Sequence, residues 1–557
     1  MAECSLRKLV ERYSVVCFHS IFAIMSREDT QNLRHLVTFG LVPLLSVGAL
    51  YVYDTYMKSQ LYPVDEDESS AENGRGMRRT ASSFFYDDES EDGDPQGRES
   101  TAVLSGPQFT MTNPEIYHAN EELSGGPWTS LGLEQPLVVA MVGLPARGKS
   151  YIVKMMIRFL TWTGFECQVF NVGSYRRKLG LAGTDASFFS TENKDGSKVR
   201  EEMARAVQAA MYEWLHESTS RNRVAFFDAT NTTVDRRLAL AKRAKSESCF
   251  LLFVESICDD EQVLARNYEL KLQNDDYKKM SVSEARHDFM QRVRMYEKAY
   301  ETIKDSEDSG NLSYIKVINI GQKMITRNCT GYLPCQISFF LQNIHIHPRK
   351  IYLSLTSMDA ENTDFFMNRQ ESKKKGRLSH AGKKYSEDLA RFLEKQRQNY
   401  AECKELLVLS GASRVHAETL FHLRMVFSCY STPLLNEMRG GALHGYTRSD
   451  IKKKFPDEYR LREKNKLNYR FPGVGGESYL DIIERIRPVI VEIERQRRSV
   501  LVVCHVAVLR CIYAYLMGTK LDEMPHLQFK PHHVYELTPG PFGCKVVDHD
   551  LSFSTTE

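Results

Sequence analysis

One transition from a strand to a loop constrains this chain more than any other feature. Residues 136–150 read PLVVAMVGLPARGKS, in which a short apolar run stops at Gly143 and enters the pattern G-x-x-x-x-G-K-S. The apolar run predicts a buried strand, and the following YIVKMMIRFL has the apolar spacing of a helix. A strand, a glycine-rich turn and a helix in this order form a phosphate-binding loop. The sequence therefore predicts that the chain binds a nucleoside triphosphate.

Each position of this loop has a physical role. Gly143 and Gly148 allow the tight turn that aims backbone N–H groups at phosphate oxygens. Lys149 supplies a mobile positive charge and Ser150 a hydroxyl for Mg²⁺, while the start of the helix adds the positive end of its dipole. The other loop residues predicted to contact ATP are Leu144, Pro145, Ala146 and Arg147.

Length and composition limit the number of domains and the kinds of partner. At 557 residues the chain is too long for one domain, and length alone predicts about three or four units. Lys and Arg number 74 against 72 Asp and Glu, so the charge balance does not indicate a nucleic-acid partner. The 12 cysteines include no C-x-x-C pair, and several, such as Cys504 and Cys511, lie in apolar runs. This pattern fits a reducing compartment better than a disulfide or zinc framework.

Residues 1–63 form an N-terminal arm whose main feature is an uncharged apolar run at 36–53. The run is near the lower length limit for a bilayer span, and one proline and two glycines weaken it as a helix. Basic residues precede it and only Lys58 closely follows, so a single span would place the ATP-using part on the wrong side of the membrane. Three interpretations stay open: no span, an inserted hairpin with the apolar run 15–25, or an amphipathic or self-associating arm.

Residues 64–134 are acidic, rich in serine and poor in aliphatic side chains. Such a segment cannot bury enough apolar surface to offset the entropy lost on ordering, so we predict a disordered linker. Within it, RRTAS places a basic pair ahead of Thr80 and Ser82, which is typical of sites for basophilic kinases. Such matches also arise by chance in disordered segments, so phosphorylation is one of two interpretations.

Residues 135–345 alternate strand-like and helical patterns, which predicts an α/β domain with a mainly parallel sheet. The runs QVFNVG, RVAFFDAT and CFLLFVESI are short and apolar and end in polar residues, so we expect buried strands. A helix-length amphipathic segment spans 198–216. Asp228 ends one of the strands, where a carboxylate is able to hold Mg²⁺ or its water shell together with Ser150.

Basic side chains near the predicted strand ends indicate an anionic second substrate. Tyr175-Arg176-Arg177 follows a strand, Arg200 is expected to open a helix, and Arg292 and Tyr296 lie one turn apart on a helix face. Each alone is most often a solvated charge. Together they provide guanidinium groups, whose geometry matches that of phosphate.

The ordered motifs GLPARGKS, FNVGSYRR, KVR, FFDATNTT, ESICDD, LKLQNDDY and RVRMYE resemble those of the bifunctional 6-phosphofructo-2-kinase/fructose-2,6-bisphosphatase family. The resemblance covers about 135–548. It implies transfer of the ATP γ-phosphoryl group to the 2-hydroxyl of fructose 6-phosphate, which makes fructose 2,6-bisphosphate, a regulator of glycolysis. It also implies Mg²⁺ as cofactor, a homodimer, and catalytic domains in the cytoplasm.

The resemblance implies roles for individual residues. Lys149, Asp228 and Lys271 match catalytic positions, with Lys271 reaching the transferring phosphate, and Cys258 matches a cysteine close to the nucleotide. The positions that match the fructose 6-phosphate site are Arg177, Arg200, Thr230, Arg292 and Tyr296. Such a set suits phosphoryl transfer, because this reaction depends mainly on positioning and on neutralising charge over the phosphate oxygens.

Residues 346–557 resemble the α/β histidine-phosphatase domain of the same family, with a change at its central position. After the strand-like KIYLS, the family has Arg-His-Gly, in which the histidine accepts the phosphoryl group, whereas this chain reads Leu355-Thr356-Ser357. A threonine hydroxyl has no basic nitrogen and cannot form phosphohistidine. We therefore predict a kinase with little or no bisphosphatase activity.

The rest of the phosphatase-like pocket still matches the family in part. The matching residues are Glu437 as proton donor, His505 as second histidine, and Arg462, Lys466, Tyr479 and Arg510 as phosphate-holding positions. Val506 replaces a glutamine, residues 473–475 contain a short insertion, and Arg414 fits the second active-site arginine only with a local gap. The pocket is interpreted as a site for fructose bisphosphates, as a support for a dimer, or as an ancestral remnant.

Two other functions stay open on the sequence alone. One is a phosphate-loop kinase for a different sugar phosphate, which a substrate panel would separate. The other is a membrane-tethered scaffold without enzymatic activity, against which the intact Lys149, Asp228 and Lys271 argue.

Overall fold

The computed structural model describes residues 135–190, 192–217, 222–356, 378–540 and 543–552. The arm and linker predicted at 1–63 and 64–134 lie outside these residues, and so do the apolar run 36–53 and the hydroxyls of Thr80 and Ser82. In the part of the chain that the structure describes, no helix is long and apolar enough to cross a membrane.

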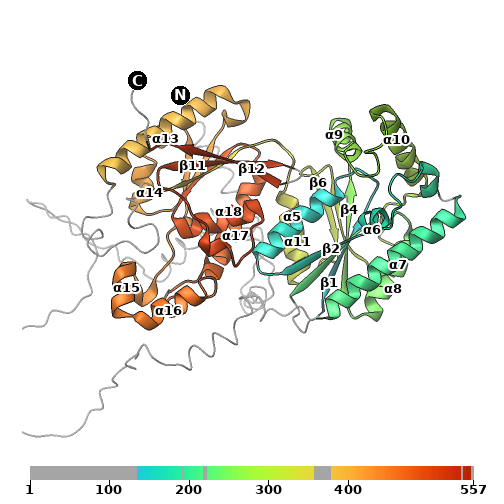
Figure 1. Ribbon diagram of the computed structural model, residues 1–557, viewed down its shortest axis with the longest axis horizontal. Coiled ribbons are helices and arrows are strands. Elements are labelled where there is room, and N and C mark those ends of the chain that lie inside the picture. The colour runs from blue at the N-terminus through green and yellow to red at the C-terminus, as the bar shows by residue number, and fades with distance from the viewer. Residues whose placement is uncertain (1–134, 191, 218–221, 357–377, 541–542, 553–557) are drawn as a thin grey trace, which may run out of the picture. The chain divides into compact units, whose positions relative to one another are not determined.

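The first sheet has six strands in the order β2-β3-β1-β4-β5-β6, and all are parallel to their neighbours except β6 (Figure 1). The chain builds first on one side of β1 and then on the other, so the carboxyl ends of β1 and its neighbours meet at a point where ligands bind in such sheets. The strands are β1 (Leu137–Val142), β2 (Glu166–Asn171), β3 (Arg223–Asp228), β4 (Phe250–Ile257), β5 (Ser313–Ile318) and β6 (Lys323–Arg327).

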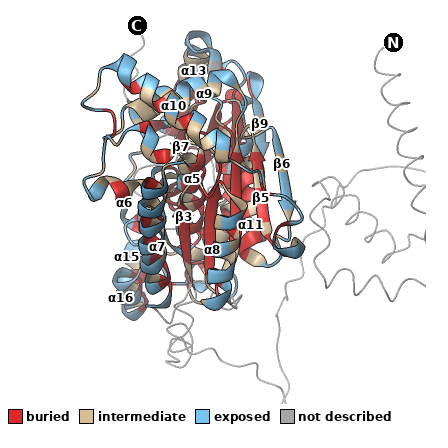
Figure 2. Cartoon of the chain, turned by 90° about the vertical axis from the view of Figure 1, so that its right-hand side faces the viewer, coloured by how far each residue is buried: buried red, intermediate tan, exposed pale blue. Residues whose placement is uncertain are grey.

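Helices cover both faces of this sheet, and Figure 2 shows its buried strands between helices with exposed outer surfaces. The odd-numbered residues of β1 pack in one core with α5 and α11, and the even-numbered ones in a second core with α7 and α8. This alternation follows from the period of two in a strand. The helices are α5 (Lys149–Trp162), α6 (Val172–Lys178), α7 (Lys194–His216), α8 (Val234–Ser246), α9 (Glu261–Leu272), α10 (Val282–Ala299) and α11 (Tyr332–Asn343).

The three predicted strands are present as β2, β3 and β4, but the expectation that all are buried is wrong for β2. This strand lies at the edge of the sheet, and its Val169 is 41% exposed. Edge strands need less apolar cover than central ones. The predicted helix begins at Lys194 rather than near residue 198, because the Asn193 side chain accepts a hydrogen bond from the Gly196 backbone N–H and caps it.

The second sheet also has six strands, in the order β12-β11-β7-β10-β8-β9, with β11 antiparallel to both of its neighbours. Helix α13 packs on one face, while α17 and α18 pack on the other. The two sheets confirm the predicted α/β class. The strands are β7 (Ile351–Leu355), β8 (Leu407–Ser410), β9 (Ser428–Ser431), β10 (Val500–Cys504), β11 (His533–Gly540) and β12 (Gly543–Asp550). The helices are α13 (His380–Asn399), α14 (Arg414–Thr419), α15 (Arg448–Lys454), α16 (Pro456–Lys464), α17 (Tyr479–Arg495) and α18 (Val506–Met517).

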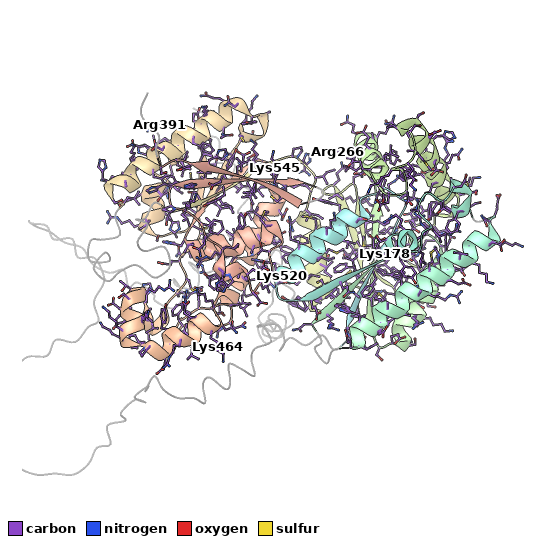
Figure 3. The ribbon with its side chains drawn as sticks, viewed as in Figure 1. Lys178, Arg266, Arg391, Lys464, Lys520 and Lys545 are labelled. Carbon is purple, nitrogen blue, oxygen red and sulfur yellow. The ribbon has the colours of Figure 1, made fainter. Side chains whose placement is uncertain are left out.

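Basic side chains are distributed over the elements of both sheets. Figure 3 labels six that come from different parts of the fold, namely Lys178 on α6, Arg266 on α9, Arg391 on α13, Lys464 on α16, Lys520 after α18 and Lys545 on β12. Of these, Arg266 lines the cavity described below. Further arginines line the same cavity, among them Arg147, Arg176, Arg177, Arg200 and Arg292.

Candidate active site

The phosphate loop leaves β1 through a turn that only glycine fits. Gly143 has a φ of 131°, and a Cβ there would lie 2.5 Å from the Ser256 carbonyl oxygen. Gly148, with a φ of 87°, is the N-cap of α5, and no side chain caps this helix start. The first N–H groups of α5 therefore have no side-chain acceptor, which is the arrangement that binds phosphate at a helix start.

Lys149, the first residue of α5, is folded onto its own loop. Its Nζ donates hydrogen bonds to the carbonyl oxygens of Gly143 and Leu144 at 2.8 and 2.6 Å. Burial lowers the pKa of Lys149 to about 7, although the nearby Asp228 carboxylate opposes this shift. A phosphate would offer the ammonium group stronger, charge-assisted partners than these two carbonyls.

Ser150 and Asp228 meet across neighbouring strands. The Ser150 hydroxyl donates to Oδ2 of Asp228 at 3.2 Å. Asn171, which pairs with Asp228 in the register of β2 and β3, donates its Nδ2 to the same oxygen at 2.5 Å. The Oδ1 of Asn171 accepts the Ser174 backbone N–H and caps α6. Asn171 was not among the predicted residues, and its place at the end of a strand was the only signal for it.

Lys271 and Cys258 come from elements on the other side of β1. Lys271 lies in the last turn of α9, where burial lowers its pKa and Asp228 opposes that shift. Cys258 follows β4, and burial raises the pKa of its thiol. A thiol with a raised pKa is a poor nucleophile, so Cys258 lines the cavity without offering a reactive thiolate.

One cavity of about 1250 Å³ collects most of the predicted residues. Its volume exceeds the roughly 300–1,000 Å³ of usual ligand pockets, so it has room for two substrates. Gly143 and Leu144 do not line it and contribute through backbone atoms. The predicted residues in its wall are Pro145, Ala146, Arg147, Gly148, Lys149, Ser150, Arg177, Arg200, Asp228, Thr230, Cys258, Lys271, Arg292 and Tyr296.

Asp276, which the sequence did not single out, gathers three arginines on one side of this cavity. Arg176 donates to both of its carboxylate oxygens at 2.7 and 2.6 Å. Arg292 and Arg177 approach at 3.5 and 3.6 Å. Burial raises the pKa of Asp276, but Arg176 and Arg292 outweigh it and the net shift is downward. Three positive charges and one negative charge leave a balance of two, which matches the roughly two negative charges of a phosphate monoester near pH 7.

Arg200 reaches the cavity from inside a helix, which corrects the expectation that it opens one. Helix α7 starts at Lys194, and Arg200 lies in its second turn. The guanidinium donates to the carbonyl oxygens of Phe188 and Ser190 and lies 5.8 Å from the centre of the Phe188 ring. These contacts point the side chain toward the segment that carries Phe189, which packs against Tyr296.

The second sheet places Thr356 and His505 at the ends of two paired strands. Thr356 follows β7, is buried, and donates its backbone N–H to the Cys504 carbonyl at 3.1 Å. His505 follows β10, and burial lowers its pKa while Glu437 opposes the shift. The neutral imidazole of His505 therefore lies beside Thr356. A residue that accepts a phosphoryl group at position 356 would need a basic nitrogen of its own, which threonine lacks.

His416 is a second histidine in this region that sequence reasoning missed. Its ring is fully buried, with its centre 4.9 Å from that of His505, and its Nδ1 lies 2.7 Å from the Ser413 hydroxyl. Burial, reinforced by His505, lowers the pKa of His416 to about 3. Because its ring has no exposed surface, His416 does not take the place of the acceptor that is missing at Thr356.

The predicted phosphate-holding residues of the second sheet have partners within the protein. Arg510 donates to the Tyr479 hydroxyl at 2.9 Å. Arg462 and Lys466 lie 3.6 and 3.7 Å from Glu463. The predicted positive charges are therefore present in this domain, and those of Arg462 and Lys466 are partly neutralised by Glu463.

Known proteins resemble both halves of the chain. The family described as 6-phosphofructo-2-kinase matches residues 125–348, and the histidine phosphatase superfamily (branch 1) matches residues 363–551. The 6-phosphofructo-2-kinase/fructose-2,6-bisphosphatase of Caenorhabditis elegans is 39% identical over 81% of this chain and 96% of its own length. This chain belongs to the 6-phosphofructo-2-kinase/fructose-2,6-bisphosphatase family.

Further relatives agree with this 6-phosphofructo-2-kinase/fructose-2,6-bisphosphatase assignment. The human 6-phosphofructo-2-kinase/fructose-2,6-bisphosphatase 3 is 38% identical over 74% of this chain and 76% of its own length. Among solved structures, a mycobacterial glucosyl-3-phosphoglycerate phosphatase covers 36% of this chain and 97% of its own, at 20% identity and a TM-score of 0.29. The two family matches and the identities to the nematode and human enzymes confirm the resemblance read from the motifs.

Membership of the 6-phosphofructo-2-kinase/fructose-2,6-bisphosphatase family settles the class of reaction. The first domain is a 6-phosphofructo-2-kinase, whose substrates are ATP and fructose 6-phosphate and whose product is fructose 2,6-bisphosphate, a regulator of glycolysis. A kinase that uses ATP works with a divalent metal ion. The kinase interpretation is confirmed, in preference to an inactive scaffold.

Proposed function

We propose that phosphoryl transfer takes place in the 1250 Å³ cavity, with ATP on the phosphate loop and fructose 6-phosphate on the arginine side. The observation that supports this most directly is the hydrogen bond between Ser150 and Asp228, which lies in the same cavity wall as Lys149 and Lys271. One phosphate-binding region is the loop after β1, and the other is the arginine cluster around Asp276. Both line the same cavity.

The two lysines neutralise charge on the nucleotide. Lys149 exchanges its carbonyl partners for phosphate oxygens when ATP binds, and contact with phosphate keeps it charged although burial lowers its pKa. Lys271, which approaches from α9, neutralises charge on the group in transfer. Since the transition state spreads charge over the phosphoryl oxygens, positioned cations supply much of the catalysis.

The donor set next to Lys149 fits Mg²⁺. A hydroxyl and a carboxylate are hard oxygen ligands, and Mg²⁺ usually takes one or two such ligands together with substrate phosphates. We assign these ligands to Ser150 and Asp228. When bound, the ion neutralises charge on the phosphate oxygens. Asn171 holds the Asp228 carboxylate in orientation through its 2.5 Å hydrogen bond.

The arginine side supplies the site for the acceptor. Arg177 and Arg292, held by Asp276, bind the phosphate of fructose 6-phosphate, and their planar groups favour a phosphate over a carbonyl or hydroxyl. Arg200, Thr230 and Tyr296 complete this part of the wall and orient the sugar.

A lysine substitution tests the site. Lys149→Met is expected to lower kcat by about 100- to 1,000-fold or more, the loss typical of removing a donor that stabilises developing charge. Lys178→Met, which changes an exposed lysine on α6, is the matched control and is expected to keep full activity. A fully active Lys149→Met enzyme would refute the assignment.

We also propose that the histidine-phosphatase-like domain has little or no bisphosphatase activity, because Thr356 stands where the acceptor histidine is required. Two functions are left for this domain. Its basic residues are able to bind a fructose bisphosphate, and the domain as a whole is able to support a dimer. Incubation with fructose 2,6-bisphosphate labelled at the 2-phosphate tests this, and release of label at the rate of a normal bifunctional enzyme would contradict it.

The remaining proposals concern organisation. We propose domains at 1–63, 64–134, 135–345 and 346–557, a homodimer, cytoplasmic catalytic domains, and membrane attachment through 36–53. Light scattering of the full chain measures its mass in solution. Cosedimentation with lipid vesicles is expected for the full chain and to be lost in Leu44→Asp/Leu45→Asp, and equal binding of both would contradict membrane attachment.

A further inference from the structure

Helix α5 has two ends with different surroundings. Its first residues, Lys149 and Ser150, belong to the phosphate loop. Its last turns, from Arg158 to Trp162, pack against the histidine-phosphatase-like domain, where the Trp162 Nε1–H donates to the Cys511 carbonyl at 2.9 Å. All described residues lie within one unit that spans 105–557, and a single hydrophobic core includes residues of α5, α11, α17 and α18. The helix that presents the catalytic residues is therefore shared by two domains.

A buried carboxylate lies at the centre of this contact. Glu494, at the end of α17, is 3% exposed and accepts hydrogen bonds from Arg158, from Arg349 at 2.8 Å and from the Tyr515 hydroxyl at 2.9 Å. The Arg158 guanidinium also lies 4.6 Å from the centre of the Tyr515 ring. Burial raises the pKa of Glu494, but the two arginines outweigh it and keep the group a carboxylate. One acid thus holds the far end of α5 with a charge-assisted bond.

A second line of contacts connects the near end of α5 to the same region. The Tyr151 hydroxyl, in the first turn, donates to the His345 carbonyl at 3.3 Å. The His345 ring lies with Nε2 2.7 Å from the Gln496 carbonyl, just beyond the end of α17. Arg497 donates to the Gly321 carbonyl at 2.9 Å, in the turn that follows β5. Both ends of α5 are therefore attached to the segment that ends α17.

This attachment borders the nucleotide cavity. Tyr151, Arg158, His345, Arg349 and Glu494 all line the cavity that contains the phosphate loop. A helix rises about 1.5 Å per residue, so Arg158 lies only about 14 Å along the axis from Lys149. Because a packed helix moves as a rigid element, a shift at Arg158 displaces Lys149 by a similar amount.

The ion cluster around Glu494 is better suited to fixing the position of α5 than to stabilising the fold. A buried ion cluster often contributes no more stability than apolar side chains of the same volume, because its desolvation cost offsets the attraction between the charges. Its hydrogen bonds are directional, so they depend on the exact place of the Arg158 side chain. The contact between Arg158 and Glu494 therefore adds an axial restraint on α5 to the close packing of the surrounding core.

We propose that Glu494 is a positioning residue for the kinase reaction, which fixes α5 through Arg158 and thereby sets where Lys149 and Ser150 meet the phosphates of ATP. The histidine-phosphatase-like domain then serves the kinase site without needing hydrolytic activity of its own. This inference rests on the roles proposed above for Lys149 and Ser150, which Lys149→Met tests separately.

The test uses the full chain with two substitutions of different severity. Glu494→Gln keeps the shape of the side chain and removes its charge, and Tyr515→Phe removes a single hydroxyl from the same cluster. Asp457→Asn, in an exposed ion pair with Arg460 of the same domain, is the matched control. For each protein, kcat, the KM for ATP, the KM for fructose 6-phosphate and the thermal midpoint are measured.

The expected signature is a selective change in ATP binding. Glu494→Gln raises the KM for ATP about tenfold while the KM for fructose 6-phosphate stays within about twofold, because displacement at the loop weakens contacts to ATP alone. Tyr515→Phe moves the KM for ATP in the same direction by a smaller factor, and Asp457→Asn changes neither KM.

Other outcomes would overturn the proposal. A KM for ATP like that of the wild type in the folded variants would show that Glu494 does not position the loop. A fall in kcat alone, in proportion to the loss of folded protein, would show a purely structural role. If Glu494→Gln does not fold, Tyr515→Phe decides between these results. If Lys149→Met is inactive while both variants behave like the wild type, only this inference fails.

Discussion

The Ser150 hydroxyl and the Asp228 carboxylate lie 3.2 Å apart, and their hydrogen bond joins the start of α5 to the carboxyl end of β3. The contact exists because β1 and β3 are parallel neighbours in register, with Ala140 opposite Phe227. The loop after one strand and the last residue of the other therefore emerge side by side. Asn171, on the next strand, completes a row of three polar groups at this edge of the sheet.

Removing the charge of Asp228 is expected to impair catalysis more than binding of fructose 6-phosphate. Asp228→Asn should lower kcat by about 100- to 1,000-fold, since an amide holds a divalent ion much less well than a carboxylate does. Asn171→Ala should have a smaller effect in the same direction, because it frees the carboxylate without removing it. Initial rates over a series of Mg²⁺ concentrations measure both, and an unchanged Mg²⁺ dependence in Asp228→Asn would contradict the role.

Asp276 is expected to set the affinity for fructose 6-phosphate. Asp276→Asn removes the group that gathers Arg177 and Arg292, so the KM for fructose 6-phosphate should rise about tenfold at an unchanged KM for ATP. The neighbouring Asp275, exposed and paired with Lys278, offers the control Asp275→Asn, which should behave like the wild type. A lower KM in Asp276→Asn would mean that the added positive charge outweighs the lost orientation.

Restoring the acceptor histidine alone is expected to leave the bisphosphatase weak. In Thr356→His, His505 and Glu437 would have a nucleophilic partner again, but Arg414 is paired with Glu418 at 3.0 Å on a half-exposed surface. The family arginine that precedes the acceptor histidine is also replaced, by Leu355, so two arginines that stabilise the developing charge are missing from their places. Acid-labile phosphate on the protein, measured after incubation with labelled fructose 2,6-bisphosphate, should be absent in the wild type and low in the variant. A normal turnover in Thr356→His would show that Thr356 is the only defect.

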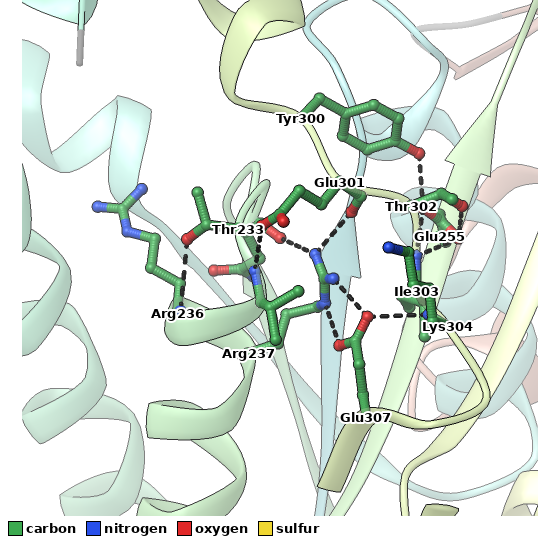
Figure 4. Close-up of polar contacts among 12 residues, drawn as sticks. Thr233, Arg236, Arg237, Glu255, Tyr300, Glu301, Thr302, Ile303, Lys304 and Glu307 are labelled. Carbon is green, nitrogen blue, oxygen red and sulfur yellow. Dashed lines mark hydrogen bonds and ion pairs between the residues drawn. The ribbon is translucent and has the colours of Figure 1, made fainter.

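Removing one partner from the buried pair of Arg237 and Glu307 is expected to destabilise the kinase domain strongly. Arg237 is fully buried and donates to Glu307 at 2.8 and 2.6 Å and to the Glu301 carbonyl (Figure 4). It also donates to the Asn231 carbonyl. Glu307→Gln would leave a buried guanidinium without a counter-charge, a change that costs about 3–5 kcal/mol. Urea denaturation of the full chain measures this.

A surface pair provides the control for that measurement. Glu247→Gln removes the partner of Arg243 in an ion pair on α8 and should change stability by no more than about 1 kcal/mol. Equal losses in the two variants would contradict the importance assigned to the buried pair. Because Asn231 follows Thr230 in the cavity wall, a destabilised Glu307→Gln should also weaken binding of fructose 6-phosphate.

His345 is expected to make stability depend on pH. The ring is neutral, since its Nδ1 accepts the His347 backbone N–H at 3.1 Å and its Nε2–H donates to the Gln496 carbonyl at 2.7 Å. Burial, followed by the charge of Arg349, lowers the pKa of His345 from the usual 6.5 to about 4. The unfolded chain therefore binds a proton at this histidine more readily than the folded chain does. The stability that the neutral His345 ring contributes is present above pH 6.5 and is lost as pH falls toward 4. The thermal midpoint should fall over this range in the wild type and fall less in His345→Gln, and equal slopes would contradict the assignment.

Contiguous residues were sufficient to predict several parts of this enzyme. The phosphate loop and the strand that ends at Asp228 are each read from a few neighbouring residues, because turn geometry and strand periodicity are local properties. The replacement at Thr356 is recognised only by comparison with the family's Arg-His-Gly. The same local signals misjudged β2, whose apolar residues do not reveal that it has only one neighbour in the sheet.

Contacts between distant residues decided the rest. Arg176 and Asp276 are 100 positions apart, and Arg158 and Glu494 are 336 apart, so no window along the chain brings either pair together. Folding places them in contact because apolar faces of strands and helices must be buried together, and the polar groups at their ends then have fixed neighbours. The local motifs thus determine which chemistry this chain is able to perform. The orientation of its charges and the attachment of α5 to a second domain are determined by the packing of the whole fold.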